Sequence, residues 1–346
     1  MTKTLIIRNY RLGDAIITLP IIYDLAIKYP QDTFYIMTDD KLAIFLDQMP
    51  DNIIHIHGFR KGSSAFRSVS YFFRKRLYYY KIRKQLLPQI QKLALLQDNN
   101  VNKKRILKYA VAKNIQIEGT DEAPFTSPER LKIKFKDDMN MYKLHIQTFE
   151  RLGYVGIKEN FDFFDPARII LNRDLEKEIG LNNNKKIIAI APFSQEKQKI
   201  YPIEQMEQIA SKLADRYQII ILGGGNKEKE IVDKWNNKNI VSLINKVDFK
   251  EEVKIISKCS LVVTMDSANL HLANLLKIPC LSIWGPTSPE NGYLPNKDRK
   301  KCYVIKNLNC QPCSLFGDTP CNNPDYLECM NIPHTEIIEK IESLLL

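Results

Sequence analysis

The sequence lacks a long apolar run, and it lacks the glycine-rich loops of the common nucleotide-binding folds. No stretch of its 346 residues approaches the ~20 apolar residues of a membrane-spanning helix. The apolar core of the opening, MTKTLIIRNYRLGD, is too short for a secretory signal, so we expect a cytoplasmic protein. No G-x-G-x-x-G follows the first apolar run and no G-K-[ST] follows Gly225, which argues against a dehydrogenase and a P-loop enzyme.

Acidic residues are missing between Arg60 and Lys92, where ten lysines and arginines alternate with aromatic residues. The formal net charge of the chain is +11, so we expect an anionic partner: nucleic acid, a phospholipid surface or a phosphorylated substrate. Cations beside aromatic rings suit a membrane interface, and they also suit single-stranded nucleic acid. The plain alternative is a solvated helix whose rings pack inward. No known nucleic-acid motif accompanies the stretch.

Apolar runs that alternate with helical stretches predict two α/β halves, each built on a parallel, doubly wound sheet. In the first half the predicted strands are 5–7, 33–37 and 53–56, with a polar loop at 9–14 and a helix from about Ala15 to Lys28. In the second half they are 186–190, 218–222, 261–263 and 280–284. We place the domains at 1–165 and 166–346. The first carries a mostly helical, basic insertion at about 60–113, and the second a cysteine-containing tail and a terminal helix.

The segment from Leu261 to Pro289 is the most informative part of the chain. Asp266 and Ser267 follow a short buried strand directly, and both residue types favour the start of a helix. Parallel αβ repeats gather such polar loops at the carboxyl ends of their strands, where open α/β sheets bind ligands. The free N–H groups of a helix start favour an anion such as a phosphate.

The pattern D-S-x-x-x-H-L-A, a strand, then W-G-P-T-x-P resembles the signature of glycosyltransferase family 9, the ADP-heptose:lipopolysaccharide heptosyltransferases. The resemblance implies the GT-B fold, with two Rossmann-like domains facing a central cleft. It implies that the N-terminal domain binds the acceptor and the C-terminal domain the nucleotide sugar. This chain has Ala268 where the family usually has glycine, which would let backbone N–H groups approach a phosphate closely. We expect the donor site to survive that change.

The opening of the chain resembles the same family. The family's R-x-x-x-x-G-D and T-x-P are matched by Arg8, Gly13, Asp14, Thr18 and Pro20. The resemblance implies that Asp14 is the general base that takes the proton from the acceptor hydroxyl. The alternative is that Asp14 is only a helix N-cap, worth ~1 kcal/mol. Arg8, Arg11 and Gly13 are expected at the acceptor, with Gly13 allowing a tight turn and a close approach.

Further donor-site residues follow from the resemblance, and each has a plainer alternative. Lys199, in a loop that resembles the family's K-x-W-P, is expected to offset charge on the leaving diphosphate, although this chain is rich in surface lysines. Glu228 is expected to bind the ribose diol, unless it is an exposed helix residue. His271 is expected to help hold the phosphates, unless it is a buried histidine that braces the loop. The remaining expected contacts are made by Ser194, Asp266, Ser267, Ala268 and Thr287, while His55, His57, His145 and His334 fit no motif.

Four of the seven cysteines are spaced as Cys310-x2-Cys313-x7-Cys321-x7-Cys329. The C-x-x-C pair is typical of the start of a zinc site, whereas the later spacing is unusual. A structural zinc site and a set of reduced cysteines that pack the tail both stay open. Persistent disulfides are not expected in a reducing cytoplasm, and no metal is expected in catalysis.

The sequence therefore predicts an inverting glycosyltransferase that moves a sugar, most simply heptose from ADP-heptose, onto a lipopolysaccharide core or a related lipid-linked glycan. The expected partners are the nucleotide sugar, the anionic acceptor and the cytoplasmic surface of the inner membrane. No cofactor and no nucleic acid are expected. The alternatives are a family 9-like transferase that uses a UDP- or GDP-sugar, and a non-enzymatic nucleic-acid-binding protein. No motif covers 35–185, where acceptor choice is expected to reside.

Overall fold

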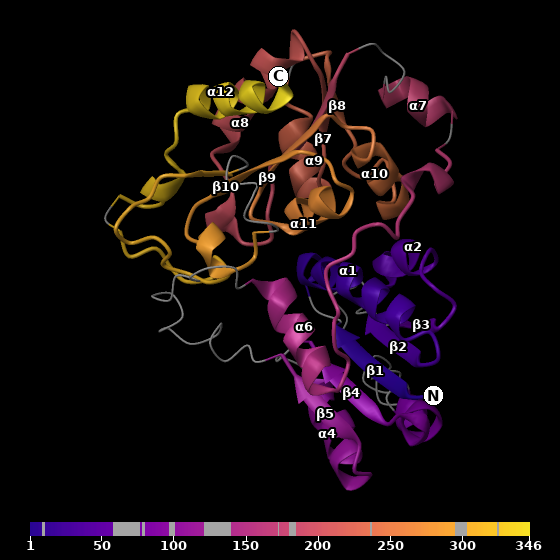
Figure 1. The fold of residues 1–346 in the computed structure, drawn as a ribbon. Helices are drawn as coiled ribbons and strands as arrows, with labels where there is room; N and C mark the ends of the chain where they lie inside the picture. Colours follow the sequence, from indigo (N-terminus) through magenta and orange to yellow (C-terminus); the bar gives the residue numbers. More distant parts are fainter. Residues whose placement is uncertain are drawn as a thin grey trace. The chain divides into compact units, whose positions relative to one another are not determined.

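The computed structural model describes residues 1–8, 11–57, 77, 80–96, 101–120, 140–171, 173–179, 185–235, 237–294, 303–323 and 325–346. These residues form two compact units, each with its own parallel sheet (Figure 1). One unit comprises Met1–Glu122 and Met141–Phe164, and the other contains Asp165–Leu346. Most of the basic stretch between Arg60 and Lys92 lies outside the described residues.

The sheet of the first unit has five parallel strands in the order β3-β2-β1-β4-β5. Its strands are β1 (Lys3–Arg8), β2 (Thr33–Thr38), β3 (Ile53–His57), β4 (Lys92–Leu95) and β5 (Gln116–Gly119). The three predicted strands are confirmed, but the interval 60–113 is not wholly helical, because β4 lies inside it and pairs with β1 from Thr4↔Lys92 to Ile7↔Leu95. A four-residue strand between helical stretches has too little periodicity to be distinguished from the end of a buried helix.

Helices cover both faces of this sheet. They are α1 (Leu12–Lys28), α2 (Ala43–Leu46), α4 (Val101–Ala112) and α6 (Met141–Arg151), with shorter turns η1 (Asp40–Leu42), η2 (Ile82–Leu86) and η3 (Leu87–Gln89). Leu5 and Ile7 belong to the cluster that includes Ile106 of α4. Because side chains alternate along a strand, Thr4, Ile6 and Arg8 face the opposite side, where α1 packs against α6.

The sheet of the second unit has six parallel strands in the order β11-β10-β9-β6-β7-β8. Its strands are β6 (Ile187–Ala191), β7 (Gln218–Ile221), β8 (Ile240–Ser242), β9 (Leu261–Met265), β10 (Cys280–Trp284) and β11 (Tyr303–Ile305). The predicted strands are confirmed. The two edge strands β8 and β11 were not predicted, since three residues each are too few to show a pattern.

The helices of the second unit follow the predicted alternation. They are α7 (Arg173–Ile179), α8 (Ile203–Ala214), α9 (Asn226–Val232), α10 (Phe249–Ile256), α11 (Ala268–Leu275) and α12 (His334–Leu345), with short turns η5 (Pro166–Arg168), η6 (Lys197–Lys199), η7 (Pro289–Asn291) and η9 (Glu328–Met330). The terminal helix α12 lies beside α8, and both contribute to an apolar core cluster of this unit (Figure 1). No helix in the described part of the chain is long and apolar enough to span a bilayer.

Both sheets have a topological switch point, where the strand order reverses. In the first sheet it lies between β1 and β4, and in the second it lies between β6 and β9. The connections that leave the two strands beside a switch point run to opposite faces of the sheet, so a crevice opens at their carboxyl ends. This position is where doubly wound sheets bind their ligands.

Candidate active site

An ion pair bridges the switch point of the second sheet. Lys199 lies in η6, after β6, and Asp266 follows β9 directly. The ammonium nitrogen of Lys199 lies 3.1 Å from Asp266 Oδ2, and the two side chains are 12% and 13% exposed. Thr287, which follows β10 and is buried, donates a hydrogen bond of 2.9 Å to the same oxygen. Loops after three neighbouring strands therefore converge on one carboxylate.

The start of α11 lies beside this carboxylate. Ser267 is the N-cap of α11, and its Oγ accepts from the backbone N–H of Asn269 at 3.4 Å and lies 2.9 Å from Thr264 Oγ1. Ala268 is the first helical residue, so the positive end of an eight-residue helix begins next to Asp266. His271 is buried one turn further along α11. The structure thus brings together most of the predicted donor-site residues.

Ser194 lies in the loop after β6, and Glu228 lies in the first turn of α9, which follows β7. Ser194 lies half-buried between β6 and η6. The Glu228 carboxylate turns back to accept a hydrogen bond of 2.8 Å from the backbone N–H of Gly224, and a Cβ added at Gly223 would lie 2.6 Å from its Oε2. Glu228 therefore holds the glycine turn after β7, and its role toward a ribose stays a prediction.

The C-terminal tail packs against these loops, a feature that the sequence reasoning missed. The backbone N–H groups of Cys313 and Ser314 donate to the Pro286 carbonyl at 3.0 and 3.1 Å. Gly317, at φ +79°, covers the stem of Lys199, and a Cβ there would lie 2.6 Å from Lys199 Cγ. The sequence signal for this contact is a glycine in the tail. A glycine does not indicate which residue it will contact in the folded protein.

Tyr201, which replaces the family's usual tryptophan, also ties the tail to the lysine loop. It is fully buried, and its hydroxyl donates to the Ile332 carbonyl at 2.6 Å. Burial raises the pKa of Tyr201 to about 12, so the phenol stays protonated and the hydrogen bond is kept at neutral pH. This hydrogen bond anchors two segments that are distant in sequence to each other.

The tail cysteines gather in one part of the unit. Burial and neighbouring thiols raise the pKa of Cys313, with Cys310 and Cys321 both acting on it. The same causes raise the pKa of Cys329 to about 11. All four are free thiols, and no group of three or more His, Cys, Asp or Glu side chains in the described ranges is arranged to hold a metal ion. The geometry gives the zinc hypothesis no support, and the zinc site and the reduced cysteines both stay predictions.

A second ion pair lies at the switch point of the first sheet. Arg8, the last residue of β1, places its Nη2 3.0 Å from Asp14 Oδ2, with the side chains 4% and 15% exposed. Nη1 of Arg8 donates to the carbonyl of Leu96, which directly follows β4. Arg8 therefore spans the switch point and holds the carboxylate predicted to be the base.

Two local expectations at this site were wrong. The helix α1 begins at Leu12 and not near Ala15, and its N-cap residue is Arg11, so Asp14 is not the N-cap. Gly13 lies inside the first turn of the helix, and the left-handed residue of the connection is Arg11, at φ 58°. Asp14 therefore does not cap α1. Its negative charge still stabilises the helix, because the first turn carries the positive end of the helix dipole.

A buried histidine, His145, lies in the same unit, although no motif pointed to it. It lies on α6 and is fully buried, with Nδ1 2.9 Å from the hydroxyl of Thr120, the residue after β5. Burial, and then the charge of Arg8, lower its pKa well below the ordinary value. A single histidine on an apolar helix face carries no local sign of its partners, so sequence reasoning could not select it.

Two doubly wound units, each with an ion pair at its switch point, define a two-domain α/β protein of the class that binds ligands at the carboxyl ends of its strands. The model of glycosyltransferase family 9 (heptosyltransferase) matches residues 88–320. The chain belongs to this family, and it is a glycosyltransferase with the family's GT-B fold. The matched range includes Lys199, Asp266 and Thr287, whereas Arg8 and Asp14 precede it.

Known relatives agree with this assignment. The chain is 25% identical over 229 residues to lipooligosaccharide heptosyltransferase 2 of Campylobacter jejuni, covering 62% of this chain and 69% of that protein. Its fold is similar to that of the glycosyl transferase family 9 of Veillonella parvula, with a TM-score of 0.72, 15% identity, and coverage of 99% and 97% of the two chains. It is also similar to ADP-heptose LPS heptosyltransferase II of Escherichia coli, with a TM-score of 0.64, 16% identity, and coverage of 100% and 98%.

Proposed function

We propose that this enzyme transfers heptose from ADP-heptose to a lipopolysaccharide or lipooligosaccharide core, with inversion at the anomeric carbon. The Campylobacter and Escherichia relatives are heptosyltransferases acting on such glycans, and the Escherichia enzyme is named for ADP-heptose. The observation that carries the proposal is the convergence of Lys199 and Thr287 on Asp266 at the switch point of the second sheet. A nucleotide sugar binds at such a point in doubly wound folds.

The donor half of the mechanism uses charge that is already in place. Asp266 holds one N–H of the Lys199 ammonium, which leaves two donors for the diphosphate. As the bond to the sugar breaks, negative charge grows on the phosphate, and the lysine and the start of α11 stabilise it. Both bonds to Asp266 are made at Oδ2, so Oδ1 is assigned to a hydroxyl of the sugar. Ser194, Ser267, Ala268, His271 and Glu228 complete the proposed donor contacts.

The acceptor half uses the first unit. Asp14 takes the proton of the acceptor hydroxyl while the oxygen attacks the anomeric carbon in a single displacement. Arg8 holds Asp14 at Oδ2, and we assign Oδ1 to the acceptor hydroxyl. Arg8, Arg11 and Gly13 are proposed to contact an anionic acceptor. The scheme needs no metal and no cofactor, since the lysine and helix charges oppose the charge of the leaving group.

The partners follow from charge and chemistry. A chain with a formal net charge of +11 attracts an anionic lipid-linked saccharide and the anionic cytoplasmic face of a membrane. We propose peripheral attachment to that face and no nucleic-acid partner. Domain limits at 1–165 and 166–346, with acceptor and donor functions respectively, complete the proposal.

Melting shifts with ADP, UDP and GDP test the donor assignment. We expect the largest stabilisation from ADP, because binding to the folded state alone raises the melting temperature. A larger shift with UDP or GDP would assign the enzyme to a different nucleotide sugar. Transfer from ADP-heptose to a heptose-deficient core, with the new anomeric linkage read by proton NMR, tests the reaction itself. ADP binding without transfer to any such core would reject the acceptor.

A further inference from the structure

The tail that follows β11 holds the loop after β10 at the carbonyl group that directly precedes Thr287. The backbone N–H groups of Cys313 and Ser314 both donate to the Pro286 carbonyl, at 3.0 and 3.1 Å. Thr287 in turn donates from its hydroxyl to Asp266 Oδ2 at 2.9 Å. The tail therefore supports the backbone from which one partner of the Asp266 carboxylate projects.

The side chain of Ser314 closes the next turn of the tail. It is 0% exposed, and its Oγ accepts from the backbone N–H groups of Gly317 at 2.8 Å and Asp318 at 3.1 Å. The N–H of Thr319 lies 3.4 Å from the same oxygen, and the hydroxyl hydrogen is donated to Asp318 Oδ1 at 3.1 Å. A serine hydroxyl has one hydrogen and two lone pairs, so all of its bonding capacity serves this turn.

The turn presents Gly317 to the stem of Lys199. Gly317 is at φ +79°, and a Cβ added there would lie 2.6 Å from Lys199 Cγ and 2.8 Å from Cδ. The ammonium group at the other end of this stem lies 3.1 Å from Asp266 Oδ2. A lysine has many rotamers in solution, and a backbone wall against its stem removes most of them. The turn and the carboxylate therefore restrain the same side chain at two points.

We propose that Ser314 is a positioning residue: its hydroxyl holds the turn that keeps Gly317 against Lys199, and this contact orients the lysine toward the diphosphate of the donor. The catalytic part of the inference rests on the proposed function, whereas the restraint on the lysine stem does not. The backbone N–H of Ser314 supports the loop that carries Thr287, so this one residue is linked to both groups that bond Asp266 Oδ2.

The first experiment measures the restraint without any activity. Lysines are acetylated with a limiting amount of sulfo-N-hydroxysuccinimide acetate, and peptide mass spectrometry gives the rate at each position. Lys199, 12% exposed, should react roughly threefold to tenfold faster in Ser314→Ala, because loss of the turn makes local opening easier. Lys197 lies in the same η6 and is exposed, so its rate should stay unchanged. An unchanged rate at Lys199, or an equal rise at both lysines, would overturn the proposal.

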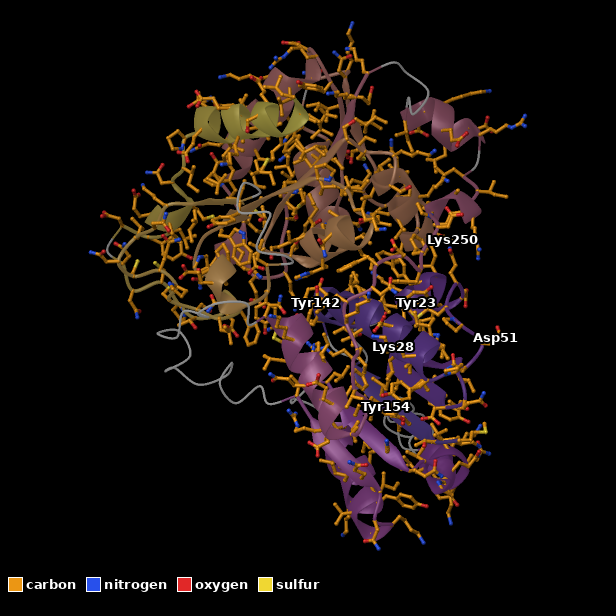
Figure 2. All side chains as sticks on the ribbon, viewed as in Figure 1. Tyr23, Lys28, Asp51, Tyr142, Tyr154 and Lys250 are labelled. Carbon is orange, nitrogen blue, oxygen red and sulfur yellow. The ribbon has the colours of Figure 1, made fainter. Side chains whose placement is uncertain are left out.

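Ser257→Ala is the matched control for a lost serine hydroxyl in the same unit. Ser257 follows α10, the helix that carries Lys250 (labelled in Figure 2), and its Oγ donates to the Lys254 carbonyl at 2.7 Å. It precedes the amino end of β9, whereas the candidate site lies at the carboxyl ends of the strands. Acetylation of Lys199 should keep its unmodified rate in this variant. A rise equal to that in Ser314→Ala would show general loosening and overturn the proposal.

A pair of variants at Asp318 tests the same turn from an exposed position, and it decides the question if Ser314→Ala does not fold. Asp318→Ala removes the acceptor of the Ser314 hydroxyl hydrogen, whereas Asp318→Asn loses the same charge and keeps an oxygen acceptor. Lys199 should react about twofold faster in Asp318→Ala than in Asp318→Asn, because only the first variant loosens the turn. Equal rates in this pair would overturn the proposal.

The kinetic experiment is a double-mutant cycle. Ser314→Ala should lower kcat/KM for the nucleotide-sugar donor by roughly tenfold, because the lysine is no longer held in place. In Lys199→Met the same substitution should cost less than about twofold, since the residue through which it acts is gone. Equal costs in the two backgrounds would overturn the positioning role. If the unmodified enzyme transferred no heptose, the proposed function would fail, while the acetylation experiment would still decide on the restraint.

Discussion

Lys199 and Asp266 lie 67 residues apart in sequence, and their charged groups meet at 3.1 Å across the switch point of the second sheet. Thr287 bonds the same carboxylate oxygen, at 2.9 Å. One carboxylate thereby fixes a cation and a hydroxyl that enter the site from separate loops. In the proposed mechanism, a lysine held in this way needs little rearrangement when charge develops on the leaving group.

Lys199→Met is expected to lower kcat by about a hundredfold to a thousandfold, the usual cost of removing one preorganised donor to developing charge. Lys197 lies in the same short helix η6 and is exposed, so Lys197→Met is the control for general loss of positive charge. Steady-state kinetics with the nucleotide-sugar donor would measure both. Similar losses in the two variants would show that Lys199 acts only through the net charge of the loop.

Gly317→Ala is expected to weaken donor binding by about tenfold, because a Cβ at Gly317 would lie 2.6 Å from Lys199 Cγ and push the lysine stem aside. Gly156→Ala is the matched control. Gly156 has φ +72° with nothing within 4 Å of its added Cβ, so it suffers the left-handed backbone strain of about 1–2 kcal/mol alone. Calorimetric titration with ADP separates the effects. Equal affinities in both variants would mean that the tail does not position Lys199.

The pH dependence of stability should contain a contribution from His145, whose pKa is lowered by burial and then by Arg8. Above pH ~6.5 the ring is neutral in the folded and the unfolded chain. Below it, the unfolded chain takes up a proton that the folded chain resists, so the free energy of unfolding falls by at most about 1.4 kcal/mol per pH unit. His145→Gln should remove this slope in urea unfolding between about pH 7 and pH 5. An unchanged slope would show that the ring titrates normally.

Thiol labelling should follow burial. Cys310 is exposed, whereas burial raises the pKa of Cys259 to about 12 and contributes to a pKa of about 11 at Cys329. Because the thiolate is the reactive form, iodoacetamide at neutral pH should modify Cys310 first and spare Cys259 and Cys329. Peptide mass spectrometry measures the order, and labelling in urea should abolish it. Rapid modification of Cys329 would contradict the packing of the tail, and faster labelling of Cys310 with a chelator would restore the zinc hypothesis.

The clustering of residues at the candidate donor site was largely predictable, and the setting of the candidate acceptor site only in part. Asp266, Ser267 and Thr287 each follow a strongly apolar strand of the second sheet, and parallel strands bring such residues to one edge. Asp14 was found by its motif, but its local setting was wrong, because a helix start at Leu12 leaves no capping signal: Arg11 makes no side-chain cap. His145 and Gly317 were missed, since nothing in the adjacent sequence indicates the residues that they approach, Thr120 and Lys199.

Short-range sterics and hydrogen bonding depend on residues that are adjacent in sequence. Apolar periodicity and capping residues therefore suffice to place most strands, α11 and the polar loops after β9 and β10. Which segments become neighbours depends on the packing of whole faces, and that is settled only when the sheet forms. Only in the folded chain does β4 pair with β1, which brings Arg8 to the Leu96 carbonyl. The contact between the tail and Lys199 also forms only on folding. The buried contacts of Thr120 with His145 and Thr148 likewise depend on three side chains that meet only in the folded core.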